Sequence, residues 1–231
     1  MHIDVVIPAL DEAASIGGVV SAVLRQSPVR SVVVVDNGSS DGTAEVARSA
    51  GARVVAEPRR GYGAACLAGI AALPDDTDVV VFLDADASDD PSELPAVIAP
   101  ILRDEADLVV GSRPLGRVER GALTLPQRVG NRIASTWLRR RFGMHATDLG
   151  PFRAIRASAL AGLSMRDRDY GWTVEMQIKA ARSGLRYAEV PVSYRRRIGR
   201  SKVSGTLRGV VGASTKILGL LASYDLGVRA R

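Results

Sequence analysis

Cysteine is nearly absent from this sequence of 231 residues, in which Cys66 is the only one. A single cysteine forms no disulfide within the chain and excludes every metal site that needs several cysteines. The first four residues also lack the basic region and apolar core of a secretory signal. We therefore expect a protein of the reducing cytoplasm.

Long apolar runs are absent as well. Residues 206–224 are apolar, but Arg208 and Lys216 divide them into pieces far shorter than the roughly 20 residues that a membrane-spanning helix needs. We expect residues 206–231 to form an amphipathic C-terminal helix or tail that lies on a membrane surface or on a partner. A helix packed on its own domain or on a second subunit is the alternative.

Aromatic residues make up only 4% of the sequence, whereas basic residues are plentiful and unevenly distributed. Residues 1–100 hold 15 acidic and 6 basic residues, and residues 101–231 hold 10 acidic and 25 basic residues. An acidic half suits a metal site, and a basic half suits phosphate, nucleic acid or an anionic membrane surface. Because the arginines are not interleaved with aromatic residues, as in a single-strand binding groove, we expect no nucleic-acid partner.

Short apolar runs alternate with helical spacing through the first half of the chain. Apolar residues 16, 19, 20, 23 and 24 predict a helix with one buried stripe. Similar patterns predict helices over 43–50, 62–73 and 92–102, and strands over 3–7, 32–35, 53–56, 79–83 and 108–110. This alternation is typical of a doubly wound, mainly parallel α/β sheet with helices on both faces. Beyond residue 111 the patterns predict a loop over 113–125, helices over 127–142 and 173–183, a strand over 186–194 and a basic, flexible stretch over 195–205.

Two carboxylates, Asp84 and Asp86, follow the buried strand 79–83. In open α/β sheets, ligands bind at the edge formed by the carboxyl ends of the strands. Neighbouring carboxylates repel each other, and Mg²⁺ or Mn²⁺ relieves this repulsion because a hard cation takes one or two carboxylates together with water and substrate phosphates. A solvated acidic turn is the alternative, since Asp89, Asp90 and Pro91 follow.

Polar residues also follow the first two predicted strands, as Pro-Ala-Leu-Asp-Glu over 8–12 and Asp-Asn-Gly-Ser over 36–39. Glycine allows close approach of the backbone to a ligand, and a carboxylate accepts hydrogen bonds from a nucleobase N–H or a ribose hydroxyl. Asp36 ends an apolar strand, where no helix cap is needed. The three strand ends together therefore predict one nucleotide site.

These ordered motifs resemble the nucleotide-diphospho-sugar transferase (GT-A) fold and, within it, glycosyltransferase family 2. Residues 8–12 resemble the family's opening motif, residues 36–39 its second-strand motif and residues 84–86 its metal-binding Asp-x-Asp. Other motifs resemble those of polyprenyl-phosphate (dolichol-phosphate) mannosyl- and glucosyltransferases, namely Gly61 to Ala65, Gly111 to Arg113, Asp148 to Arg153, and Glu189 to Val192 followed by Arg197, Gly199, Ser201 and Lys202. The resemblance covers almost all of residues 1–205, which we expect to form one GT-A catalytic domain.

The resemblance implies roles for the matching residues, with Glu12 on the ribose and Asp36 on the base. The implied nucleotide-binding set is Pro8, Ala9, Leu10, Glu12, Asp36, Gly38, Asp84 and Ala85. Asp84 and Asp86 are the implied metal ligands, and Arg113, Arg197 and Lys202 the implied contacts to phosphates of acceptor or donor. We expect Asp148 to be a catalytic residue together with Asp84 and Asp86. It would act as a general base or acid near the acceptor, or else it caps the turn at Gly150.

Two positions depart from the family's pattern. Tyr62 stands where many relatives carry a lysine, so the corresponding phosphate contact is absent or passes to Arg59 or Arg60. Ser88 stands where some relatives carry a longer metal-coordinating side chain, which leaves a third protein ligand open. Glu175, on the predicted helix 173–183, either faces the site or lies on the helix surface.

The resemblance implies a metal-dependent, inverting transfer of a hexose from a UDP- or GDP-linked sugar to a polyprenyl phosphate. The enzyme would work at the cytoplasmic face of a membrane as a peripheral protein, with a second copy or a membrane partner as a further expectation. The alternatives are a glycosyltransferase for a soluble or protein hydroxyl and a catalytically silent module that binds nucleotide sugars or nucleic acid. A dinucleotide-dependent oxidoreductase is excluded because no Gly-x-Gly-x-x-Gly opens the first helix.

Overall fold

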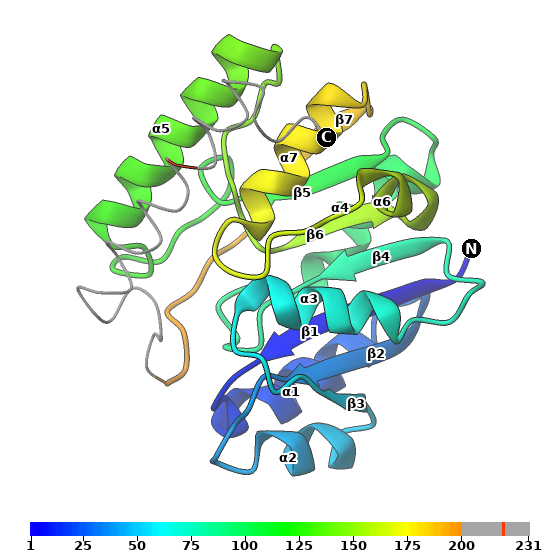
Figure 1. Cartoon of the computed structure of the whole chain (residues 1–231). Helices are drawn as coiled ribbons and strands as arrows, with labels where there is room; N and C mark the ends of the chain where they lie inside the picture. Colours follow the sequence, from blue (N-terminus) through cyan, green and yellow to red (C-terminus); the bar gives the residue numbers. More distant parts are fainter. Residues whose placement is uncertain (200–218, 220–231) are drawn as a thin grey trace.

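The computed structural model describes residues 1–199 and Gly219 (Figure 1). The predicted tail over 206–231, the domain boundary at residue 205 and the predicted phosphate contact Lys202 lie outside the described residues. Within the described part of the chain, no helix is long and apolar enough to cross a membrane.

One seven-stranded sheet lies at the centre of the described residues, with the strand order β3-β2-β1-β4-β6-β5-β7. The strands are β1 Ile3–Ala9, β2 Val29–Asp36, β3 Arg53–Ala56, β4 Val79–Phe82, β5 Leu108–Ser112, β6 Arg153–Arg156 and β7 Tyr187–Pro191. Neighbouring strands are parallel except in the two pairs that include β6. The sheet is therefore mainly parallel, as the alternation of patterns predicts.

The strand β6 and the helix α6 (Ala157–Leu163) are not predicted by the sequence patterns. β6 has only the four residues Arg-Ala-Ile-Arg, so no apolar run marks it. Arg153 is nevertheless fully buried, because its guanidinium donates hydrogen bonds to the backbone oxygens of Leu149, Gly150 and Thr173. A hydrophobicity pattern predicts a buried strand from apolar residues, so it does not reveal β6, in which a buried residue is an arginine.

Helices cover both faces of the sheet, as predicted (Figure 1). Besides α6, they are α1 Ala13–Leu24, α2 Thr43–Ser49, α3 Tyr62–Ala71, α4 Leu94–Leu102 after the 3-10 turn Pro91–Glu93, α5 Leu125–Phe142 and α7 Trp172–Arg182. Buried side chains of α1, α2 and α4 pack on one face of the sheet. Those of α3, α5, α6 and α7 pack on the other face.

Helix α5 begins two residues before its predicted start because Thr124 and Gln127 form a capping box. The hydroxyl of Thr124 accepts from the amide of Gln127 at 3.4 Å, and the side chain of Gln127 accepts from the amide of Thr124 at 2.8 Å. The helix ends before Gly143, whose φ of 65° favours glycine.

The carboxyl ends of β1, β2 and β4 lie side by side. Ala9 is in register with Asp36, and Val6 is in register with Phe82. The amide of Asn37 also donates to the backbone oxygen of Ala9 over 2.9 Å. The loops that follow these three strands therefore leave the sheet at one edge, where the sequence predicts the nucleotide site.

Candidate active site

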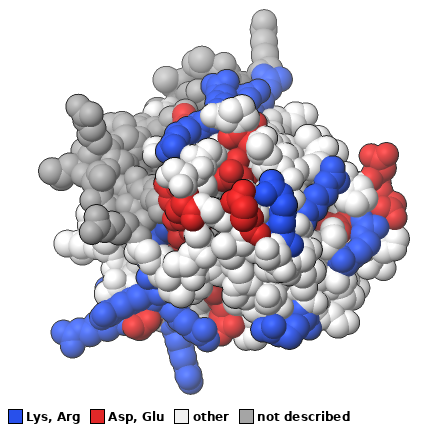
Figure 2. All heavy atoms as spheres, turned by 90° about the horizontal axis from the view of Figure 1, so that it is seen from below, with Lys and Arg blue, Asp and Glu red and all other residues white. Residues whose placement is uncertain are grey.

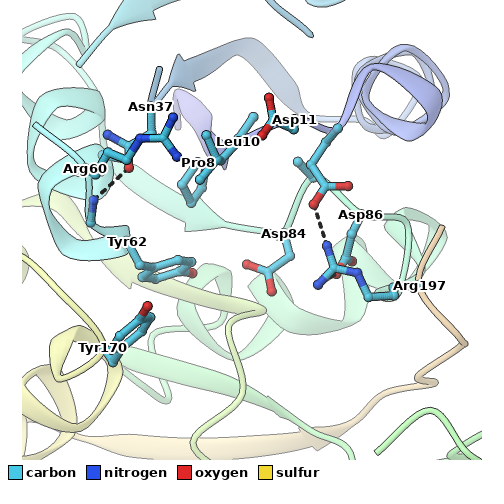
Figure 3. A pocket seen from close by; sticks show the side chains of 15 residues that line it. Pro8, Leu10, Asp11, Asn37, Arg60, Tyr62, Asp84, Asp86, Tyr170 and Arg197 are labelled. Carbon is cyan, nitrogen blue, oxygen red and sulfur yellow. Dashed lines mark hydrogen bonds and ion pairs between the residues drawn. The ribbon is translucent and has the colours of Figure 1, made fainter. Parts of the chain in front are cut away.

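A pocket of about 590 Å³ lies at this edge of the sheet (Figure 3). Its walls come from residues 8–12 after β1, Asn37 after β2, residues 60–62 at the start of α3, residues 84–86 after β4, and Ala65, Tyr170 and Arg197. The predicted site residues that line it are Pro8, Ala9, Leu10, Glu12, Asp84, Ala85, Asp86 and Arg197. Residues as distant in the sequence as Glu12 and Arg197 thus meet around one cavity.

Asp86 is only 6% exposed, and residues of its own loop hold its carboxylate. Its Oδ1 accepts hydrogen bonds from the amide of Ser88 at 2.9 Å and from the Ser88 hydroxyl at 2.5 Å. Its Oδ2 lies 3.3 Å from Nη1 of Arg197. Ser88 therefore orients Asp86.

Asp84 is partly buried beside Asp86. Burial, together with the negative charge of Asp86, raises the pKa of Asp84 to about 7. The charges of Arg113 and Arg197 and a hydrogen bond from Tyr62 oppose this rise of the pKa. A bound cation would favour the ionised form of both carboxylates.

Asp89, the next carboxyl group in this loop, is 2% exposed and forms an antiparallel bridge with Tyr194. Burial, and then the charge of Asp84, raises the pKa of Asp89 well above its usual range. Because Asp86 and Asp89 are both buried, the alternative of a solvated acidic turn is wrong.

The guanidinium of Arg197 lies between two carboxylates of the pocket (Figure 3). One terminal nitrogen donates to Glu12, and the other lies 3.3 Å from Asp86. Residues 194–198, here called the strap, cross the loop over residues 86–90, and the amide of Ile198 donates to the backbone oxygen of Asp86 at 2.9 Å. The strap thus brings a positive charge into an acidic pocket.

The donor atoms of the pocket fit a hard divalent cation, since Asp84 and Asp86 supply carboxylate oxygens. Among the described residues, no group of three or more histidine, cysteine or acidic side chains could hold a metal ion. Mg²⁺ is usually bound by one or two carboxylates, with water and substrate phosphates in its other positions. The two carboxylates therefore suit a cation that arrives with a diphosphate.

Two other predicted site residues, Arg113 and Asp148, bind each other beside the pocket. Asp148 is buried, and its carboxylate accepts from Nε and Nη2 of Arg113, both at 2.7 Å, and from the Arg113 amide at 2.9 Å. The guanidinium also lies over the ring of Tyr194, 4.9 Å from its centre. The pair joins the end of β5 to the residues before β6, and its roles with an acceptor stay predictions.

Asp36 ends β2, and its Oδ1 accepts a hydrogen bond from the amide of Ser39 at 3.0 Å. Its neighbour Asn37, to which the sequence motifs assign no role, lines the pocket, whereas Asp36 does not. The Asn37 side chain accepts from the amide of Gly61 at 2.8 Å and donates to two backbone oxygens in the loop before α3. Base recognition by Asp36 and Gly38 stays a prediction.

A comparison with protein families agrees with this geometry. Glycosyl transferase family 2 matches residues 4–165, which include every acidic side chain of the pocket wall. The chain belongs to glycosyl transferase family 2. It is therefore a glycosyltransferase with the GT-A fold, as its strand-end motifs predict.

Relatives of this family 2 enzyme include proteins named for lipid phosphates. The chain is 31% identical, over an alignment of 249 residues, to the undecaprenyl-phosphate mannosyltransferase of Micrococcus luteus, covering 100% of this chain and 99% of that protein. It is 35% identical over 205 residues to the dolichyl-phosphate hexose transferase of Haloferax volcanii, covering 86% and 85% of the two chains.

A solved structure with the same fold is the glucosyl-3-phosphoglycerate synthase of Mycobacterium tuberculosis in complex with Mn²⁺, uridine-diphosphate-glucose and phosphoglyceric acid. The TM-score is 0.78 at 27% identity, and the match covers 96% of this chain and 79% of that chain. The likeness extends over the strands and helices that build the pocket.

Two tyrosines, Tyr62 and Tyr170, line the pocket of this family 2 chain, although the sequence motifs imply no role for them there (Figure 3). They meet because the loop before α7 packs closely on the start of α3, where the amide of Gly63 donates to the backbone oxygen of Asp169 at 3.2 Å. A Cβ atom at Gly63 would lie 2.1 Å from the backbone oxygen of Asp167. The Gly-x-Gly spacing around Tyr62 is the sequence signal for this close approach.

Glu175 fits neither interpretation of its position on helix α7. It is 2% exposed and is not part of the pocket wall. Its carboxylate accepts from the amides of Arg166 and Asp167, at 3.1 and 2.7 Å, and pairs with Lys179 at 2.9 Å. Glu175 therefore fixes the turn that carries Tyr170.

Proposed function

We propose that this enzyme transfers a hexose, with inversion, from a UDP- or GDP-linked donor to a polyprenyl phosphate at the cytoplasmic face of a membrane. The observation that carries the proposal is the pocket in which Asp84 and Asp86 follow β4 and face Glu12 and Arg197. The relatives named for undecaprenyl-phosphate and dolichyl-phosphate transfer support the lipid acceptor. The neighbouring structure with Mn²⁺ and uridine-diphosphate-glucose supports the donor class and a cofactor of Mg²⁺ or Mn²⁺.

The nucleoside enters between the loops after β1 and β2. Glu12 accepts hydrogen bonds from the ribose hydroxyls, and Asp36, beside Gly38, accepts from the base. Residues 8–10 and Ala85 form the wall of the base pocket with their backbone and small or apolar side chains.

The diphosphate lies next to Asp84 and Asp86, which hold the cation. When bound, the cation neutralises the charge that develops on the diphosphate leaving group. Arg197 already lies 3.3 Å from Asp86, so its guanidinium reaches a phosphate bound at the same carboxylates. Tyr62 lines the same pocket as Asp84.

The acceptor side favours a phosphate over a hydroxyl. A phosphate oxygen is already ionised at pH 7, whereas a hydroxyl acceptor needs a general base. The carboxylate of Asp148, predicted to be a general base or acid or else a cap, is bound by Arg113 through two hydrogen bonds of 2.7 Å. In this proposal Asp148 serves catalysis by orienting Arg113 toward an anionic acceptor.

A second candidate function is transfer to the hydroxyl group of a soluble, phosphate-bearing acid. It is favoured by the likeness to a synthase crystallised with phosphoglyceric acid, at a TM-score of 0.78. The same donor half of the pocket would serve both functions, so only the acceptor distinguishes them.

The test is release of nucleotide from UDP-glucose and GDP-mannose, each with a short-chain polyprenyl phosphate, with 3-phosphoglycerate, or with no acceptor. We expect release that depends on the polyprenyl phosphate and on Mg²⁺ or Mn²⁺, and that Asp86→Ala removes while the circular dichroism spectrum stays unchanged. Nucleotide release that only 3-phosphoglycerate stimulates would refute transfer to a polyprenyl phosphate and support transfer to a soluble, phosphate-bearing acid. Unchanged release in EDTA would contradict the metal assignment.

A further inference from the structure

We propose that α5 is the element by which this protein docks on an anionic lipid surface. The proposal rests on the function above, because a docked α5 brings the pocket to a lipid-phosphate acceptor. Its apolar residues would enter the boundary between headgroups and acyl chains, and its arginines would bind lipid phosphates.

The first observation is an exposed apolar stripe on α5. Leu125, Val129 and Ile133 are 74%, 49% and 48% exposed. Residues four positions apart share one face of a helix, and this face is opposite the one that buries Ala134 and Leu138 against the core. Three of the nine exposed large apolar side chains among the described residues belong to this one stripe. Such grouping, unlike scattered exposure, marks an interaction surface.

The second observation is the charge along the same helix. The 18 residues of α5 contain five arginines and no acidic residue. All five arginines are exposed, and at 3.6 residues per turn Arg128, Arg132 and Arg139 lie along one border of the stripe. The helix therefore presents an apolar centre beside a purely cationic margin.

This charge pattern decides among the possible occupants of the stripe. In a symmetric dimer that placed α5 against α5, Arg128, Arg132 and Arg139 of one copy would face the same three arginines of the other, because α5 contains no acidic residue. The chain over 200–231 is an equally poor match, because it has six basic residues and one acidic residue, Arg200, Lys202, Arg208, Lys216, Arg229 and Arg231 against Asp225. An anionic bilayer complements both the apolar and the cationic part of the surface.

The face of the described residues on the side of α2 and β3 lacks this pattern. On the side of α2 and β3, acidic and basic side chains lie next to each other (Figure 2). On α2, for example, Arg48 lies 3.6 Å from Glu45. Mixed charge of this kind gives no preference for an anionic surface.

The stripe is also connected to the pocket. The loop before α5 pairs with the strap, since the amide of Glu119 donates to the oxygen of Tyr194 and the amide of Tyr194 donates to the oxygen of Arg117, both at 2.8 Å. The strap carries Arg197 into the pocket, and α5 and the strap lie on the same side of the molecule (Figure 1). Docking through α5 therefore places the pocket near the lipid surface.

The test is flotation of the full chain with vesicles of phosphatidylcholine alone and of phosphatidylcholine mixed with phosphatidylglycerol. We expect binding to the anionic vesicles only, weakened by salt. Arg128→Gln/Arg132→Gln should weaken it about 30-fold, at about fivefold per arginine, and Val129→Ser/Ile133→Ser at least tenfold. The matched control Arg25→Gln/Arg48→Gln, which removes two exposed arginines at α1 and α2, should bind like the wild type.

Equal binding of the wild type and Arg128→Gln/Arg132→Gln to anionic vesicles would overturn the proposal. A dimer in analytical ultracentrifugation that Val129→Ser/Ile133→Ser abolishes would assign the stripe to a second copy and also overturn it. A second assay measures transfer to a short-chain polyprenyl phosphate in detergent, and both α5 variants should retain this activity. The assay therefore tests the proposed function separately from the docking surface. A protein that binds anionic vesicles but transfers to no lipid phosphate would refute the proposed function and leave the docking surface standing.

Discussion

The side chains of Glu12, Asp84, Asp86 and Arg197 set the charge balance of the pocket. Arg197 is shared between Glu12 and Asp86. Asp84 is left with a pKa raised to about 7 by its burial and by the charge of Asp86. The unliganded pocket therefore favours the entry of a cation, and Arg197 competes with that cation for Asp86.

Replacement of Arg197 should separate metal binding from donor binding. In Arg197→Ala we expect Mn²⁺, without nucleotide, to bind about tenfold more tightly, or by ~1.4 kcal/mol, because a positive charge 3.3 Å from Asp86 is lost. UDP-glucose should bind more weakly, because the proposed contact of Arg197 with a donor phosphate is lost. Calorimetric titrations measure both affinities. Arg195→Ala, which removes the neighbouring arginine paired with Asp90, is the control; unchanged Mn²⁺ affinity in Arg197→Ala would refute the idea of competition.

In the absence of metal, ionisation of the Asp84 side chain should lower the free energy of unfolding. Its folded pKa of about 7 exceeds the unfolded value of about 3.9, so the folded protein loses stability as the pH rises from 4 through 7. In EDTA at pH 8, Asp84→Asn should raise the free energy of unfolding by at most about 4 kcal/mol, and at pH 4 by little. Urea denaturation measures the difference, and the exposed Asp75→Asn serves as the control. A destabilised Asp84→Asn protein at pH 8 would contradict this assignment.

At the scale of elements, the pocket depends on the contact between the start of α3 and the loop over 167–169. Gly61 has a φ of 143°, and a Cβ atom there would lie 2.1 Å from the backbone oxygen of Arg168. Because both partners of this contact are backbone, no change of rotamer relieves it. The position of Tyr62 against Tyr170 follows from how closely the two segments approach.

Gly63→Ala tests this contact with a matched control in another helix. A Cβ atom at Gly63 meets a backbone oxygen at 2.1 Å, so the two segments must separate, and we expect a loss of about 2–4 kcal/mol of stability and a raised KM for the donor. Gly18→Ala in α1 meets nothing within 4 Å and should gain about 0.5–1 kcal/mol. Thermal denaturation and steady-state kinetics measure both effects. A Gly63→Ala enzyme as stable as the wild type would show that this packing is not required.

For the whole molecule, the two edges of the sheet use carboxylates in opposite ways. At the amino edge, hydrogen bonds from Arg30 lower the pKa of buried Asp4 although burial raises it, and Arg186 holds the pKa of Asp107 at about 2. At the carboxyl edge, burial raises the pKa values of Asp84 and Asp89. The amino edge thus stabilises the fold through its ion pairs, whereas the carboxyl edge keeps Asp84 and Asp89 buried with raised pKa values.

This division predicts a stability maximum near pH 4 for the metal-free protein. From about pH 2 to 4, Asp4 and Asp107 ionise into paired positions and add stability, because their folded pKa values lie below the unfolded value of about 3.9. From about pH 4 to 7, ionisation of Asp84 lowers the stability. Mn²⁺ with UDP should raise the stability at pH 8 and move the maximum upward. Melting temperatures across this range test the prediction, and a steady rise from pH 4 to 8 in EDTA would refute it.

Much of the fold and of the donor half of the pocket follows from local sequence. Alternating apolar patterns predict β1 to β5 and the helices on both faces, because burial of one stripe or one run depends on residues near in the chain. The positions of Asp84 and Asp86 follow from the end of β4, and the strand-end motifs indicate family 2. The observed end of a helix differs from the predicted end where a capping residue determines it, as Thr124 does at the start of α5.

Only the tertiary structure decides which charges meet. It pairs Arg197 with Glu12 and Asp86, binds Arg113 to Asp148, and buries Arg153 in β6 among backbone oxygens. It also leaves the stripe of α5 exposed, although its spacing suits a buried face equally well. The physical reason is that the energy of a charge, and the burial of an apolar face, depend on segments that are distant in the sequence and adjacent only in the fold.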